Sequence, residues 1–182
     1  DVNFTSTPCK GMRFWGGKLY VVRDGSLVVF PSADKVATPK VIIGPVSGPN
    51  AIFSFSDNGS TLVIATGGDM YQYDGVTLSV ISSVTLTPGV VQFLNERFIT
   101  NGDDGGTYVS DVLSTNFDIA NVFYTRSSTD DAVCPYVFNQ IVYGFGASSI
   151  EPWEDTGVGL PPMGRINGGI VESVGISSEF SV

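Results

Sequence analysis

The sequence predicts an all-β fold of the β-propeller type, built from four-stranded antiparallel blades of about 40 residues. Gly and Pro account for 22 and 10 of the 182 residues and are spread along the whole chain. They punctuate segments rich in β-branched and aromatic residues, which favours short strands and tight turns over helices. Paired strand-like segments with a glycine turn between them also recur along the chain at a regular interval.

The first hairpin joins residues 18–23 to residues 26–30 through Asp24-Gly25, a sequence typical of two-residue β-hairpin turns. The second unit shows a complete blade. Its four strands are expected at residues 51–56, 61–65, 69–73 and 77–81. Two further hairpins follow, one joining residues 97–100 to 107–110 and the other joining 140–145 to 148–153.

Equivalent positions in these hairpins, namely Leu27, Met70, Thr107 and Ile150, recur at intervals of about 40 residues. We expect one domain over residues 1–182, since 42% hydrophobic content supports one core. Its units are predicted at about 10–45, 49–83, 88–120 and 131–160, with the start of a further unit at 164–182. This predicts an incomplete fragment of a larger propeller. A β-sandwich is the alternative, because short strands at regular spacing also fit that fold.

The composition excludes several classes of function. A net charge of −9 with only nine Lys and Arg residues leaves no basic surface for gripping nucleic acid. The absence of His removes the commonest general base and the Ser-His-Asp arrangement. No apolar run of about 18 residues and no signal peptide is visible, so we expect no membrane contact. Cys9 and Cys134 are expected to be buried free thiols in a reducing cytoplasm.

Clustered carboxylates are the one feature that suggests catalysis. Glu151 with Asp130 or Asp131 could supply the acid and nucleophile of a glycosidase, and Trp153 could stack on a sugar. Acidic residues beside glycines are more often turn residues, because Asp tolerates left-handed backbone and bonds its own turn amides. Residues 101–106 likewise lack the ligand spacing of a calcium loop. We therefore predict no catalytic, metal or cofactor site.

A resemblance to a known family rests on residues 133–157. A strand ending in Gly144-Phe145-Gly146 is followed by Ser148-Ser149, then by Ile150-Glu151, the aromatic Trp153, and Thr156-Gly157. This succession resembles the packaged-DNA-stabilisation, or tail-hub, proteins of short-tailed bacteriophages. The motif positions are Gly144, Phe145, Gly146, Ile150, Glu151, Trp153, Thr156 and Gly157. Pro152 departs from a regular strand, so an irregular strand is expected there.

The resemblance implies a structural head-to-tail adaptor of the virion tail, assembled in the host cytoplasm, and not an enzyme. Such a protein would form a homo-oligomeric ring, close the portal channel, stabilise packaged DNA, and support a tail needle and tail fibres or tailspikes. The implied partners are the portal or adaptor protein and those tail components, without sequence-specific nucleic-acid binding. The alternatives are a carbohydrate-active propeller and a propeller that binds an unrelated host protein, because fold does not fix function.

Overall fold

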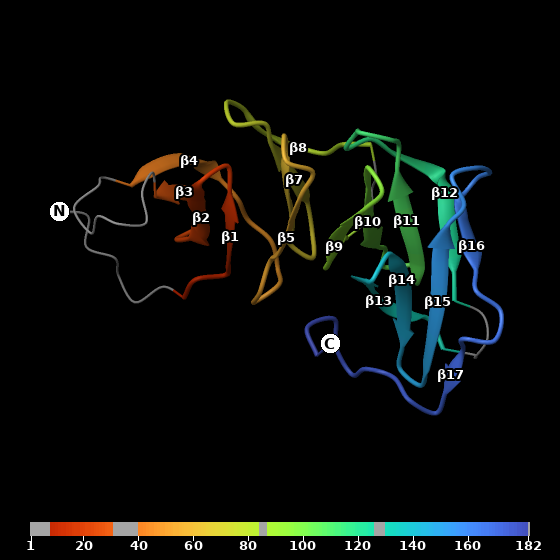
Figure 1. The fold of residues 1–182 in the computed structure, drawn as a ribbon. Helices are drawn as coiled ribbons and strands as arrows, with labels where there is room; N and C mark the ends of the chain where they lie inside the picture. Colours follow the sequence, from red (N-terminus) through yellow and green to blue (C-terminus); the bar gives the residue numbers. More distant parts are fainter. Residues whose placement is uncertain (1–7, 31–39, 84–86, 126–129, 182) are drawn as a thin grey trace.

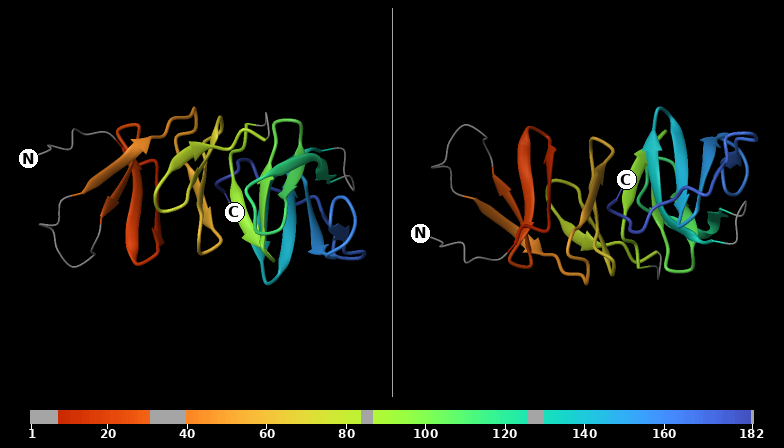
Figure 2. Two further views of the ribbon diagram at one scale, coloured as in Figure 1. Left: turned by 90° about the horizontal axis from the view of Figure 1, so that it is seen from above. Right: turned by 90° about the horizontal axis from the view of Figure 1, so that it is seen from below.

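A computed structural model describes residues 8–30, 40–83, 87–125 and 130–181. Four antiparallel sheets follow one another along the chain and lie side by side in space (Figure 1). The first strands of consecutive sheets are neighbours: β1 lies beside β5, β5 beside β9, and β9 beside β13. Figure 2 shows the same succession from above and below. This serial packing of small sheets is the propeller arrangement, and it excludes the β-sandwich, in which only two sheets face each other.

Each sheet has its strands in sequence order. The first contains β1 (Gly11–Trp15), β2 (Lys18–Arg23), β3 (Ser26–Phe30) and β4 (Val41–Pro45). The second contains β5 (Ser54–Asp57), β6 (Leu62–Ala65), β7 (Met70–Tyr73) and β8 (Leu78–Val80). The third contains β9 (Val91–Leu94), β10 (Arg97–Asn101), β11 (Gly106–Ser110) and β12 (Phe117–Tyr124). The fourth contains β13 (Ala132–Phe138), β14 (Ile141–Gly146), β15 (Ser149–Asp155) and β16 (Met163–Arg165), with β17 (Val171–Glu172) beside β15.

The four hairpins expected from the sequence are confirmed as β2–β3, β6–β7, β10–β11 and β14–β15. At the β2–β3 turn, Asp24 and Gly25 both have positive φ, 53° and 69°. A pair of positive φ values is the type I′ geometry that matches the twist of the flanking strands. The β13–β14 turn adopts the same conformation with Asn139 and Gln140, at φ values of 50° and 65°. A two-residue turn of this kind therefore does not require glycine here.

Among the residues that the structure describes, the core lies between the sheets, in three apolar clusters. Strand β6 shows why: all four of its residues are buried, because Leu62 and Ile64 face the first sheet while Val63 and Ala65 face the third. The third cluster joins the third and fourth sheets through residues such as Phe123 and Val142. A strand in the middle of a propeller is thus apolar on both faces, which explains its continuous hydrophobic run.

The segment 164–182, in which we expected a further blade to begin, adds strands to the fourth sheet in this structure. Strand β16 pairs with the end of β15 through Trp153 and Arg165. Strand β17 pairs with the start of β15 through Ile150 and Val171. The third sheet also extends to Tyr124, beyond the expected end of its unit at residue 120. Turns after Asp155 and Arg165 bring the chain back alongside β15.

The expectation that Pro152 makes its strand irregular is wrong. Pairing between β14 and β15 runs from Val142 and Trp153 to Phe145 and Ile150 without a shift in register. The carbonyl of Pro152 accepts a bond from Ile166 N at 3.0 Å, so its backbone polar groups face the opposite side. On that side β16 has ended and β17 has not begun, so the missing N–H interrupts no ladder bond.

The two cysteines differ in their surroundings. Both are free thiols, and Cys134 is buried as expected. Cys9 is exposed, contrary to the expectation, because it precedes β1 and lies outside the first sheet. Burial, and to a smaller extent the charge of Glu179, raises the pKa of the Cys134 thiol to about 12. Cys134 therefore behaves as an apolar core residue near neutral pH.

Candidate functional site

The motif positions identified in the sequence lie on one hairpin, β14–β15, and on the turn that follows it. Gly144 and Glu151 are register partners across this hairpin, as are Phe145 and Ile150. Partners in a ladder share one face of the sheet, so Gly144 and Glu151 point the same way. The motif therefore describes one structural unit and not residues gathered from distant segments.

Gly144 is required by a close approach between the third and fourth sheets. A Cβ atom at this position would lie 2.5 Å from Thr125 Cγ2, closer than any ordinary contact. Thr125 follows β12 and is itself buried. Glu151, on the same face as Gly144, has 0% of its surface exposed. The Gly144–Glu151 pair thus belongs to the interface between two blades.

Gly146 ends β14 next to Asp130. The Asp130 carboxylate accepts bonds from Ser148 N at 2.6 Å and from Ser149 Oγ at 3.0 Å. A Cβ atom on Gly146 would lie 2.4 Å from Asp130 Oδ2. The small residue lets the carboxylate reach the β14–β15 turn and satisfy its donors, which is the structural role expected of an acidic residue beside a turn.

Trp153 packs between the same two sheets. Its ring lies 4.4 Å from the ring of Phe123, centroid to centroid, with the planes tilted by 35°. Both rings belong to the cluster that joins the third and fourth sheets. An aromatic ring held in this way serves inter-blade packing, and it is not presented as a platform for a sugar.

Thr156 and Gly157 form the turn after β15. Thr156 N donates to Pro162 O at 3.0 Å, and Thr156 Oγ1 donates to Val158 O at 2.8 Å. Gly157 has a φ of 69°, the left-handed region that favours glycine, and its N–H donates to Asp155 Oδ1. The end of the motif therefore fixes the loop that returns the chain into β16.

This geometry argues against a glycosidase. Glycoside hydrolysis requires two carboxyl groups that flank a bound sugar. Glu151 is enclosed between two blades, and Asp130 is bonded to the turn at Ser148. Asp131 is exposed. The described part of the chain contains no group of three or more carboxylate or thiol side chains placed to hold a metal ion.

Asp104, in the turn that raised the question of calcium, binds protein groups instead. Its Oδ2 accepts bonds from Tyr108 Oη at 2.6 Å and Tyr124 Oη at 3.0 Å, and its Oδ1 accepts from Gly106 N at 3.0 Å. Burial opposes ionisation of Asp104, yet these bonds together hold the pKa of its carboxyl below the usual value. Burial and the same contact raise the pKa of Tyr108. The cluster fastens the β10–β11 turn to β11 and β12.

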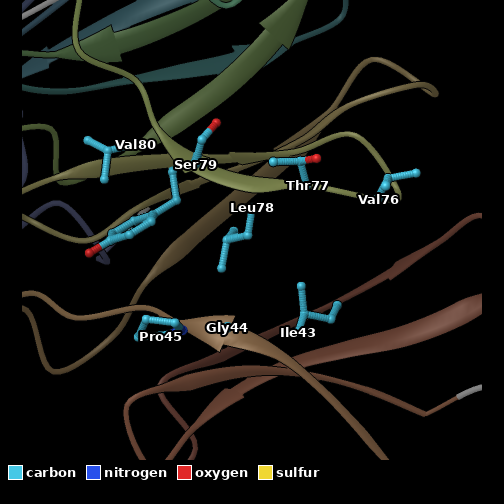
Figure 3. Close-up of a pocket in the computed structure, with 9 residues that line it drawn as sticks. Ile43, Gly44, Pro45, Val76, Thr77, Leu78, Ser79 and Val80 are labelled. Atoms are coloured by element: carbon cyan, nitrogen blue, oxygen red, sulfur yellow. The ribbon is translucent and has the colours of Figure 1, made fainter.

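A surface groove lies between the outer strands of the first two sheets. It has a volume of about 420 Å³ and is lined mainly by apolar residues of β4 and of the β7–β8 region. Leu78 points toward Gly44 across the groove (Figure 3). A Cβ atom at Gly44 would lie 3.0 Å from Leu78 Cδ2, so the glycine permits this approach. The groove is shallow and apolar and brings together no group able to do chemistry.

The face of the first sheet turned away from the second is apolar. It is exposed along the outer strands β1 and β4, whereas Val28 at its centre is only 5% exposed. Met12, Val21, Val28 and Ile42 are successive register partners across the sheet, so they form one row on this face. Met12 and Ile42 are 63% and 62% exposed, and Phe14, two residues along β1, is 63% exposed. In the interior of the row of sheets the corresponding faces are covered by the next blade. The exposed apolar side chains of β1 and β4 on this face have the character of a contact surface.

Sequence reasoning missed this exposed face, although its signal is present. Met12 and Phe14 alternate with Arg13 and Trp15, the period-2 pattern of a strand between two environments. Both sets are partly apolar, which indicates a strand suited to burial on both faces.

Within the described residues no helix is long and apolar enough to cross a membrane.

Solved structures with similar folds support the propeller. The computationally designed Ika8 protein matches with a TM-score of 0.59 and 14% identity, over 85% of this chain and 48% of its own. YCF48 bound to D1 peptide matches with a TM-score of 0.62 and 11% identity, over 91% and 54%. Kluyveromyces lactis Hsv2p matches with a TM-score of 0.57 and 12% identity, over 82% and 50%. The chain spans about half the length of these proteins.

A search of curated proteins gave no match. A family profile described as Bacteriophage P22 Gp10, beta-propeller, matches residues 6–179, which is nearly the whole chain. The profile covers all four sheets and the Gly144–Gly157 motif, and it agrees with the fold and with the resemblance seen in the sequence. The chain therefore belongs to the phage-stabilisation family described as Bacteriophage P22 Gp10, beta-propeller, a family of phage structural proteins.

Proposed function

We propose that this chain is the propeller part of a tail hub, which closes the portal channel after DNA packaging and supports the tail needle and fibres or tailspikes. Membership of the phage-stabilisation family supports a structural role in the particle. The proposed hub is a ring of copies that contacts the portal on one side and the tail components on the other. The role requires binding surfaces and no turnover.

The observation that carries the proposal is the exposure of Met12, Phe14 and Ile42 on the outer strands of the first sheet. Met12 and Phe14 would not be left in water by a chain that acts alone, because a large apolar surface favours association. The chain also spans about half of the propellers it resembles. In the hub this face is covered by further blades or by a neighbouring subunit.

The net charge of −9 fits the same role. A strongly acidic protein repels the phosphate backbone, so it can stand in the path of packaged DNA without binding it tightly. Retention of DNA then depends on the protein closing the channel mechanically. We therefore expect DNA retention to respond to the assembly of the protein, with little dependence on individual charged residues.

The test is electron microscopy of phage particles that carry or lack the complete protein, combined with a measurement of DNA retained in the heads. Particles with the protein should show a ring of propellers below the portal and should keep their DNA. Met12→Lys with Phe14→Lys should reduce both, whereas Ile119→Lys, at another exposed apolar position, should not. Density elsewhere in the particle, or full DNA retention without the protein, would overturn the proposal.

A further inference from the structure

The chain after β17 turns back and lies against the first strands of the second, third and fourth sheets. Figure 1 shows this last segment running from β17 beneath β13 and toward β9, and Figure 2 shows its end close to β9. The segment ends in a turn in which Ser181 N donates to Ser178 O at 3.1 Å. Glu179 and Phe180 occupy the two central positions of this turn.

The Glu179 carboxylate is held in a site formed by Asn50 and Gly89. Asn50 Nδ2 donates to Glu179 Oε1 at 2.6 Å. A Cβ atom on Gly89 would overlap the carboxylate, because it would lie 2.4 Å from Glu179 Cδ. The φ of Gly89 is not in the left-handed region, so its backbone does not require glycine. What requires glycine at this position is the space that the carboxylate occupies.

Asn50 is held in place by contacts that do not involve the Glu179 carboxylate. Its N–H donates to Thr66 O at 3.1 Å, and its carbonyl accepts a bond from Lys10 Nζ at 2.9 Å. Its side-chain amide lies over Gly67, where a Cβ atom would clash with it. The Lys10 ammonium also donates to Gly48 O at 3.0 Å, which ties the backbone on this side of Asn50 to the first sheet. The Asn50 amide is therefore held in position to donate to a carboxylate.

Phe180 lines a groove beside this site and is 39% exposed. The groove has a volume of about 200 Å³, and its walls come from β5, from β9 with the residue before it, and from β13. They include Val90, Pro135 and Tyr136, which provide an apolar surface, and Cys134 lies at the same place. The aromatic ring next to the bound carboxylate thus forms one wall of a groove to which three consecutive sheets also contribute.

The bound turn contributes little to the blades. All buried residues of the three apolar clusters precede residue 164. Ser173 and Val174, which follow β17, are exposed. Ile176 N then donates to Gly146 O at 3.0 Å, so the segment is tied to the fourth sheet just before the turn. A segment with few buried apolar contacts opens at low free energy while the rest of the structure stays folded. The turn can leave its site without unfolding a sheet.

We propose that the Asn50–Gly89 site and its adjoining groove form an exchangeable docking site for a turn that carries a carboxylate followed by an aromatic ring. In the isolated chain the occupant is Glu179-Phe180 of the same molecule. Between two copies the occupant is the same turn of the second copy. Exchange of an identical element costs little, because every interaction broken within one chain forms again between the two chains.

The direct test is binding of a fluorescent peptide with the sequence of residues 175–181, followed by fluorescence anisotropy. The receptor is the full chain carrying Glu179→Gln and Phe180→Ala, which leaves the site open. We expect the peptide to bind this variant, and to bind the unmodified chain at least tenfold more weakly because the tethered turn competes. Adding Asn50→Asp to the open variant should weaken binding at least tenfold by charge repulsion.

A peptide with Gln in place of Glu179 should lose affinity for the open variant to a similar degree. Failure of the peptide to bind the open variant would overturn the proposal. So would binding that responds neither to Asn50→Asp nor to the Gln peptide.

A second variant tests release of the turn. Gly89→Ala should expel the carboxylate while the sheets stay folded, as checked by circular dichroism. In a Cys9→Ser background, the rate at which Cys134 reacts with a maleimide should then rise at least tenfold over the same chain with Gly89. An unchanged rate in a folded Gly89→Ala chain would contradict the site.

Discussion

The indole ring of Trp153 lies on the ring of Phe123, with the centroids 4.4 Å apart. This contact joins β15 of the fourth sheet to β12 of the third. We expect Trp153→Ala to lower the free energy of unfolding by about 2 to 3 kcal/mol, because a partly buried aromatic ring loses its packing and leaves a void. Urea unfolding followed by tyrosine fluorescence or circular dichroism measures the loss.

Phe138→Ala provides the matched control for this prediction. Phe138 lies in the same sheet but is 65% exposed, so its removal should change the free energy of unfolding by less than about 0.5 kcal/mol. Equal effects of the two substitutions would contradict the assignment of Trp153 to the inter-blade core.

A methyl group at Gly144 should be as damaging as the loss of a core side chain. Gly144→Ala places a Cβ atom 2.5 Å from Thr125 Cγ2 in a buried contact, and we expect a loss of about 1 to 3 kcal/mol from overpacking. Thr125→Ser removes the clashing methyl group and keeps the hydroxyl. The double variant should therefore recover part of the stability lost in Gly144→Ala, as a double-mutant cycle would measure. If the stability losses of Gly144→Ala and Thr125→Ser simply add in the double variant, the methyl group added at Gly144 does not clash with Thr125.

The contribution of the Asp104–Tyr108 hydrogen bond to the free energy of unfolding should depend on pH. The pKa of Asp104 is lower in the folded chain than in the unfolded chain, so its contribution is present above the unfolded pKa, near 4. It is lost as the pH falls through the lower folded pKa. Tyr108→Phe should cost about 1 kcal/mol at pH 7 and progressively less on acidification.

The measurement is the urea midpoint of both chains between pH 7 and pH 2.5. Tyr136→Phe, on an exposed ring in the fourth sheet, is the control and should show no such convergence. A difference between Tyr108→Phe and the unmodified chain that stays constant with pH would refute an ionic role for this bond.

The two thiols should differ in reactivity. With a pKa of about 12, Cys134 is ionised in only about one molecule in ten thousand at pH 8. Cys9 is exposed, so it alone should react rapidly with a thiol reagent in the folded chain. Mass spectrometry should find one modified cysteine under native conditions and two in urea. Rapid native labelling in a Cys9→Ser chain would show that Cys134 is accessible.

The hairpins were predictable where their turns use glycine, as at Asp24-Gly25, because few other residues accept left-handed backbone. The turns at Asn95-Glu96 and Asn139-Gln140 have the same geometry without glycine, so the first strands of the third and fourth sheets were not identified as hairpin partners. Tertiary packing holds these turns in place. The local sequence preference alone would not predict them.

The motif positions were predicted correctly as a local pattern, but their roles come from the neighbouring sheet. Nothing near Gly144 in the sequence reveals that Thr125 presses against it. The meeting of Asn50, Gly89 and Glu179 depends equally on the succession of the sheets, since Asn50 and Glu179 are 129 residues apart. Contacts of this kind follow from the fold and have no signature within a short window of sequence.

Each of the three apolar clusters in the described part of the chain is shared by two consecutive sheets, so each of these sheets depends on a neighbour for its core. Unfolding of one sheet exposes the apolar face of its neighbour, so a single proteolytic cut can destabilise the neighbouring sheets as well. The same dependence makes growth simple. A blade added at either end would repeat a sheet-to-sheet contact that the chain already makes. Such a protein can therefore gain or lose whole blades while the packing between its other blades stays the same.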